Sequence, residues 1–145
     1  MLVSSEREKT ALAFVYMAHG DQKDKTGHPY QEHLYRVAQL VPDHLKLSAY
    51  AHDVLEDTTT VEADLYNVGF NPWEVNLVKL LTHYPNERMS DYLLDVGSDS
   101  DAKRIKIADI TDNLSRNRME GLDEATQERL KSKYYKALCF LADVR

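Results

Sequence analysis

Apolar side chains recur along most of the chain at the three- and four-residue spacing of an amphipathic helix. Residues 5–19, for example, place Leu12, Val15 and Tyr16 on one side of such a helix. The same spacing predicts helices over 29–41, 45–56, 59–69, 71–82 and 101–117, a short one from Ser90, and a last one over 123–143. No alternating strand pattern or internal repeat stands out. The sequence therefore predicts an all-α fold of about seven to eight helices.

Several residues predict where these helices begin and end. Pro42 is expected to end the second helix, because proline cannot donate a backbone hydrogen bond. Thr59 and Glu62 have the spacing of a capping box and predict a helix start at Thr59. Asn71 and Glu74 form a second signature of the same kind.

Size and charge narrow the class of protein. The 145 residues suit one compact domain, which we expect to span 1–145. Cys139 is the single cysteine and lies in an apolar run, so we expect a core residue in a cytoplasmic protein. There is no apolar leader and no membrane-spanning run, which argues against a membrane partner. The net charge of −6 argues against a nucleic-acid polymer as partner.

The densest group of ionisable residues interrupts the most apolar part of the predicted helix over 45–56. Helical spacing places His52 one turn from Glu56, and Asp53 one turn from Asp57. Three carboxylates and an imidazole on a partly buried face are costly without a compensating cation. A His-Asp pair alone is common on helices without a metal. The added carboxylates favour a metal site here.

Two further polar residues lie in apolar surroundings. His33 has Leu34 and Val37 beside it, and a lone histidine in such a place is more often structural than a ligand. Asp109 lies inside an apolar run and needs a polar partner, and Asn113 one turn later could contact the same ligand. Two histidines and two aspartates together suit Mn, Fe, Co, Ni or Zn rather than Ca.

The order His33, His52-Asp53, Asp109 resembles the H…HD…D signature of the HD-domain phosphohydrolases. A wider pattern over residues 5–116 resembles the hydrolase domain of RelA/SpoT-type proteins, which remove the 3′-pyrophosphate from guanosine tetra- and pentaphosphate. It consists of AHGDQ at 18–22, KTGHPYQEH at 25–33, AHD at 51–53, EDT at 56–58, LT at 81–82, KIAD at 106–109 and NL at 113–114. The chain is too short to add the synthetase domain of that family. It is thus similar to the small alarmone hydrolases.

This resemblance implies a role for each matching residue. The implied metal ligands are His33, His52, Asp53 and Asp109, and the family metal is usually Mn²⁺. Glu56 and Asp57 match the acidic pair that handles the attacking water. The implied substrate residues are Lys25 at the nucleotide, Asn113 within the same pocket, and Gly27 and Tyr30 at its entrance. The implied partner is a small nucleotide, and oligomeric state is not predicted.

Some positions depart from the family pattern. Asp24 stands where the family often has an arginine that stacks on guanine, which places a negative charge near the expected base. Leu34 and Ile110 also replace the usual residues. Three alternatives therefore stay open: a phosphatase for a nucleoside monophosphate or phosphorylated dinucleotide, a module that senses a nucleotide without cleaving it, and a structural helical adaptor. The complete set of candidate ligands favours an enzyme.

Basic residues near Asp109 allow two interpretations. These are Arg104, Lys106, Arg116 and Arg118. They could form a patch that faces phosphate groups, or they could belong to an ordinary solvated helix face. In an acidic chain, any charge that binds phosphate has to be local.

Overall fold

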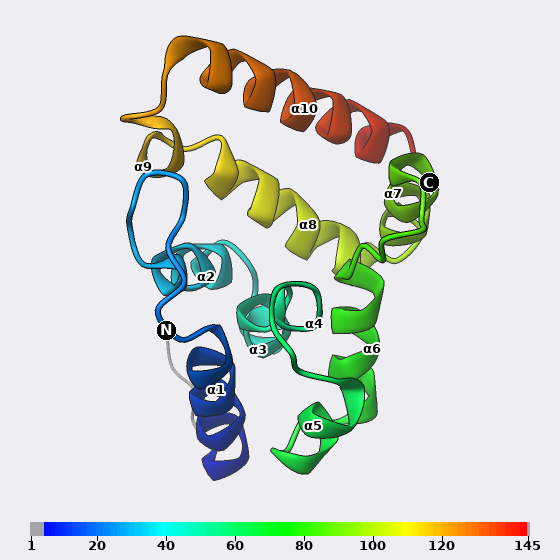
Figure 1. The fold of residues 1–145 in the computed structure, drawn as a ribbon. Helices are drawn as coiled ribbons and strands as arrows, with labels where there is room; N and C mark the ends of the chain where they lie inside the picture. Colours follow the sequence, from blue (N-terminus) through cyan, green and yellow to red (C-terminus); the bar gives the residue numbers. More distant parts are fainter. Residues whose placement is uncertain (1–4, 145) are drawn as a thin grey trace.

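The computed structural model describes residues 5–144, and helices make up its regular structure apart from one isolated bridge between Lys23 and Pro29. The prediction of an all-α fold is confirmed. The elements, labelled in Figure 1, are α1 (Glu6–His19), α2 (Tyr30–Gln39), the 3-10 turn η1 (Asp43–Leu45), α3 (Lys46–Tyr50), α4 (Val54–Asp57), α5 (Glu62–Asn67), α6 (Pro72–Leu81), α7 (Met89–Gly97), α8 (Ser100–Asn113), α9 (Arg116–Met119) and α10 (Glu124–Asp143).

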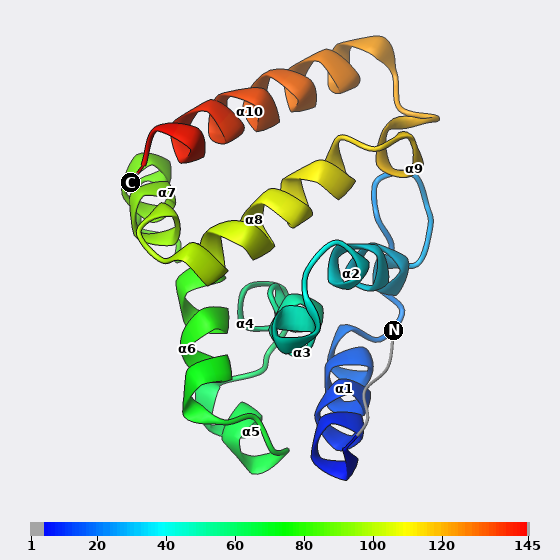
Figure 2. The ribbon, with the colours of Figure 1, turned by 180° about the vertical axis from the view of Figure 1, so that it is seen from behind.

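Helix α8 lies in the middle of the molecule. Figures 1 and 2 show α10 running beside it on one side, while α2, α3 and α6 lie on the other. Contacts join α8 to α2, α6, α7 and α10, and they join α3 to α1, α2 and α6. A residue on α8 can therefore face either the main core or the space under α10. No described helix has the length and apolar character needed to cross a membrane.

The ends of α5 and α6 show two kinds of helix cap. The predicted signature at Asn71 and Glu74 is confirmed, since each side chain accepts a hydrogen bond from the other residue's backbone N–H. The predicted capping box at Thr59 is wrong. Helix α5 begins at Glu62, and the Val61 N–H donates to the carboxylate of Asp64 at 2.9 Å. Thr58 before it is extended, and its hydroxyl donates to the carbonyl of Val54 and accepts from the backbone N–H of Thr60.

The predicted helix over 45–56 is interrupted at residues 51–53, which form a turn between α3 and α4. The turn is held in part by the side chain of His52, whose Nδ1 lies 2.6 Å from the carbonyl oxygen of Ala49. The expected stacking of His52 over Glu56 therefore does not occur on one continuous helix. The predicted helix over 101–117 is likewise divided, into α8 and α9. These two divisions explain why the helices are shorter and more numerous than predicted.

The core lies between α8 and the helices that precede it. Its fully buried members include Val15, Leu34, Leu45, Leu65, Leu77 and Ile105. The assignment of Cys139 to the core is wrong, because this residue of α10 is exposed. Helix α10 buries Leu130 and Leu141 and leaves the intervening face partly open. That face covers the site described next.

Candidate functional site

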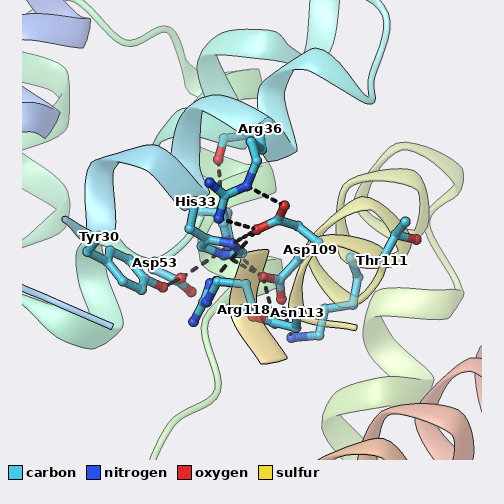
Figure 3. Close-up of polar contacts among 12 residues, drawn as sticks. Tyr30, His33, Arg36, Asp53, Asp109, Thr111, Asn113 and Arg118 are labelled. Carbon is cyan, nitrogen blue, oxygen red and sulfur yellow. Dashed lines mark hydrogen bonds and ion pairs between the residues drawn. The ribbon is translucent and has the colours of Figure 1, made fainter. Parts of the chain in front are cut away.

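Four of the predicted site residues converge between α2, α8 and the turn at 51–53. His33, His52, Asp53 and Asp109 each offer one atom, and these atoms all lie within 4.8 Å of one another. Nε2 of His33 and Nε2 of His52 lie 3.0 Å and 3.2 Å from Oδ1 of Asp109. Figure 3 shows His33 and Asp53 directed towards Asp109 from different elements. The sequence pattern therefore located a true cluster.

Hydrogen bonds on the outer side of each imidazole fix its orientation. Nδ1 of His52 faces the carbonyl of Ala49, which can only accept, so Nδ1 carries the proton. In the neutral ring, Nε2 then has a lone pair that points at the carboxylate oxygens of Asp53 and Asp109. The Nε2 lone pair and the carboxylate oxygens are all acceptors, and they would repel one another at about 3 Å unless a proton or a metal cation lay between them. Histidines that bind a metal usually donate the N–H of their other ring nitrogen to a hydrogen-bond acceptor, as His52 does here.

The pKa shifts of the clustered residues also indicate a site for a cation. Burial opposes a charge on His52, but Asp53 and Asp109 outweigh it and raise the pKa of His52 well above its usual value. Burial also opposes the charge on Asp109, yet Lys106 and His52 hold its pKa well below the usual range. Ionised carboxylates around a small buried space attract positive charge. A donor set of two imidazole nitrogens and two carboxylates fits a divalent transition metal.

A ring of polar side chains supports these four residues. Lys106 Nζ donates to Asp109 Oδ2 at 3.1 Å, and Asn113 Nδ2 donates to Asp109 Oδ1 at 3.3 Å. The Tyr30 hydroxyl donates to Asp53, as Figure 3 shows. Burial, reinforced by Asp53 and Asp109, raises the pKa of Tyr30, so its hydroxyl stays protonated. The carboxylates are thereby held in fixed orientations.

Asp112 is a site residue that the sequence analysis missed. Its Oδ2 lies 2.6 Å from Nδ1 of His33, and its Oδ1 accepts from Nε of Arg36 at 2.7 Å. A signal was present, because Asp112 follows Asp109 by three residues and shares its helix face. A second buried aspartate on that face is as much in need of a partner as the first.

A cavity of about 560 Å³ opens from this cluster. Its lining includes Asp53 and Asp109 on one side and side chains of α10 on the other. The predicted residues Tyr30, Glu56, Asp57 and Asn113 all line it. Lys25 and Gly27 do not: they lie in the loop before α2, where both are exposed. The structure thus brings together most of the predicted site and leaves two residues at a distance from the cavity wall.

The acidic pair lies at the edge of the cavity. Glu56 accepts a hydrogen bond from the backbone N–H of His83 at 2.8 Å. Burial, with repulsion from Asp53 and Glu56, raises the pKa of Asp57 to about 6. A carboxyl group with such a pKa can exchange a proton near neutral pH, as general acid–base catalysis requires.

The basic residues near Asp109 divide into two groups. Lys106 and Arg118 line the cavity, whereas Arg104 and Arg116 are exposed on the surface. Helix α10 adds cations to the wall that the sequence analysis did not assign to the site, namely Lys133 and Lys136, together with Tyr134. The cavity therefore has an acidic side at the four-residue cluster and a basic side under α10.

Asp24 does not face the cavity as the sequence suggested. It is absent from the lining, and its Oδ1 accepts hydrogen bonds from the backbone N–H groups of Thr26 and His28. Its other oxygen lies 3.4 Å from Nε of Arg118. The carboxylate of Asp24 is therefore hydrogen-bonded within its own loop and paired with Arg118, and it does not face the cavity.

Comparisons with known proteins agree with the resemblance drawn from the sequence. No protein-family model matches the chain. A guanosine-3′,5′-bis(diphosphate) 3′-pyrophosphohydrolase of Aquifex aeolicus (strain VF5) is 31% identical over 123 residues, which cover 76% of this chain. The match covers only 18% of the Aquifex protein, so this chain corresponds to a small part of that relative.

A solved structure has the same fold over the whole chain. It is described as a metazoan ortholog of SpoT that hydrolyzes ppGpp and plays a role in starvation responses. The TM-score is 0.80 and the identity 22%, with 100% of this chain and 90% of the other covered. The likeness to RelA/SpoT-type hydrolase domains is therefore confirmed in fold and in sequence relationship.

Proposed function

We propose that the protein is a metal-dependent hydrolase that releases pyrophosphate from the 3′ position of guanosine 3′,5′-bis(diphosphate). The observation that carries the proposal is the convergence of His33, His52, Asp53 and Asp109 at the acidic end of a cavity. The Aquifex relative and the SpoT ortholog supply the substrate class. An enzyme explains the cluster better than a sensor or a structural adaptor, because Glu56 and Asp57 lie beside it.

The four clustered residues are the proposed metal ligands, and Mn²⁺ is the proposed metal. Support comes from the donor set and from the fixed outer nitrogens of both histidines. A cation bound there supplies a Lewis acid that polarises a phosphoryl oxygen and makes water a stronger nucleophile. Tyr30 and Lys106 would keep Asp53 and Asp109 in place for this task.

Glu56 and Asp57 are the proposed proton-handling residues. Hydrolysis removes a proton from the attacking water and returns one to the departing 3′ oxygen of the ribose. Asp57, with a pKa of about 6, is mostly ionised at neutral pH and can accept and return a proton there. Glu56 is held at the cavity edge by the backbone of His83, in a position to orient the water.

The remaining substrate contacts follow from the cavity lining. We assign Tyr30 and Asn113 to the wall that faces the nucleotide. Lys25 lies in the exposed loop before α2 and is proposed to reach the nucleotide at the cavity entrance. Burial, together with the charges of Lys106 and Lys25, lowers the pKa of Lys133 in the cavity wall. Gly27, with φ of +85°, allows the tight turn of that loop.

One observation favours a second candidate, a phosphatase of the same class with another nucleotide substrate. Asp24 offers no stacking surface to a base, so guanine selectivity has no support at that position. A nucleoside monophosphate or a phosphorylated dinucleotide could use the same metal ligands and the same basic wall.

A product analysis separates the two candidates. Protein loaded with Mn²⁺ is incubated with guanosine 3′,5′-bis(diphosphate) and with a panel of nucleoside monophosphates and phosphorylated dinucleotides. Ion-exchange chromatography is expected to show guanosine diphosphate and pyrophosphate from the first substrate. Orthophosphate from the panel, with the bis(diphosphate) unchanged, would exclude the alarmone and leave the second candidate.

A further inference from the structure

Arg118 is a cation within the cavity that is held close to the proposed metal ligands. The short helix α9 carries it into the lining, and its side chain is only 16% exposed. Its Cζ atom lies 5.7 Å from the centre of the Tyr30 ring, whose hydroxyl bonds Asp53. Figure 3 shows its guanidinium on the side of the cluster where Tyr30 and Asp53 lie.

A buried carboxylate fixes this guanidinium in place. Asp24, with a side chain 2% exposed, lies 3.4 Å from Nε of Arg118. Its Oδ1 is held by the backbone of Thr26 and His28 and by the Thr26 hydroxyl at 2.6 Å. Figures 1 and 2 both show the loop before α2 beside α9. The carboxylate therefore cannot turn away, and it leaves Oδ2 to pair with Arg118.

The donors of Arg118 are nonetheless largely unused. The next carboxylate is Asp112, whose oxygen lies 3.9 Å from Nη1, too far for a hydrogen bond. Asp112 is already hydrogen-bonded to His33 and Arg36. Within residues 5–144 the guanidinium donates no hydrogen bond, and Nη1 is enclosed without a partner. Arg116, two residues earlier, lies instead on the surface with Glu120.

A positioned guanidinium with unused donors is suited to an oxyanion. Its planar arrangement of N–H groups matches two oxygens of a phosphate, and such charge-assisted bonds are stronger than neutral ones. Asp24 balances part of the charge but uses few of the donors. Arg118 lies beside Tyr30, which bonds Asp53, and beside Asp112, which bonds His33, so an anion on Arg118 lies next to the proposed metal ligands.

We propose that Arg118 is a phosphate-binding residue of the cavity and that Asp24 is its positioning residue. The phosphoryl group held by Arg118 is the one that faces the four-residue cluster. The identity of the substrate as a 3′-pyrophosphate rests on the proposed function, whereas the binding of a phosphate anion rests on the geometry of Arg118 alone.

The test is the affinity for inorganic pyrophosphate, which needs no turnover. Isothermal calorimetry is performed on the whole chain, loaded with Mn²⁺ and freed of excess metal. Arg118→Ala is expected to weaken binding about tenfold or more, the scale for lost hydrogen bonds from a charged donor. Arg116→Ala is the matched control, because it removes the same charge from the same helix at an 86% exposed side chain, and its affinity is expected to stay unchanged.

Two milder variants guard against a general loss of structure. Arg118→Lys keeps the charge but removes the planar donor group, and Asp24→Asn keeps a turn acceptor but removes the charge that holds Arg118. Both are expected to weaken pyrophosphate binding by an intermediate factor, while the circular dichroism spectrum stays that of the wild type. Added guanidinium ion is expected to restore part of the affinity of Arg118→Ala, which a purely structural role would not allow.

Equal affinities for Arg118→Ala and Arg116→Ala would overturn the inference, as would a wild-type protein that does not bind pyrophosphate. These outcomes are separate from the failure of the proposed function. A protein that leaves guanosine 3′,5′-bis(diphosphate) intact but binds pyrophosphate through Arg118 would contradict only the function.

Discussion

The carboxylate of Asp112 lies 2.6 Å from Nδ1 of His33, while the other ring nitrogen, Nε2, meets Asp109. Arg36 holds the other oxygen of Asp112 at 2.7 Å. This chain of contacts fixes the ring so that Nε2 points into the four-residue cluster. Asp112 therefore acts on the proposed metal through His33, although it is not one of the proposed ligands.

Asp112→Asn is expected to lower metal affinity by about 10- to 100-fold, the usual effect of removing a partner from a metal-binding histidine. A titration with Mn²⁺, followed by the bound fraction, measures it. Asp101→Asn provides the control, since Asp101 lies on the same helix away from the cavity. If Asp112→Asn binds the metal as tightly as the control does, His33 does not need this partner.

Glu56→Gln separates metal binding from catalysis. The variant keeps the shape of the side chain but loses its charge, so the metal is expected to stay bound while turnover falls by roughly 10²-fold or more. Glu62→Gln is the control, because Glu62 lies on α5, outside the cavity lining, where it pairs with Lys79. Steady-state kinetics at saturating metal decide the matter. Unchanged turnover would show that Glu56 has no part in proton handling.

The raised pKa of Asp57 predicts a pH-dependent stability of the metal-free protein. The folded pKa of about 6 lies above the ordinary value of 3.8, so ionisation of Asp57 disfavours the folded state. This cost builds up as the pH rises from about 4 to 6 and is complete above 6. Asp57→Asn should therefore have a higher melting temperature than the wild type at pH 8, and the gain should largely disappear at pH 4.5. An equal gain at both values would mean that the pKa is not raised.

The sequence predicted the site best at positions where ionisable residues lie among apolar ones. His52, Asp53 and Asp109 could be selected because ionisable groups among apolar neighbours require a partner, and the resemblance to the H…HD…D signature added His33. The break at residues 51–53 could not be predicted, since apolar spacing continues from Leu47 across it to Leu55 and the bond from His52 to Ala49 belongs to the folded state.

The basic wall of the cavity depends on tertiary packing. Periodicity predicted a helix over 123–143, but not that α10 leaves a cavity above α8 with Lys133 and Lys136 in its lining. The pairing of Asp24 with Arg118 joins residues far apart in the chain, and neither has a local signal for the other. Such pairs become visible only when the loop before α2 is placed against α9.

We propose that one metal ion held by the four clustered residues is required for hydrolysis. The most direct measurement determines Mn²⁺ content and pyrophosphate release from guanosine 3′,5′-bis(diphosphate) on the same samples of wild type, His52→Ala and His44→Ala. His44 is an exposed histidine outside the cavity and serves as the control. About one ion per chain and full release are expected for wild type and His44→Ala, with both lost together in His52→Ala. Full metal content or full pyrophosphate release in His52→Ala would contradict the proposal.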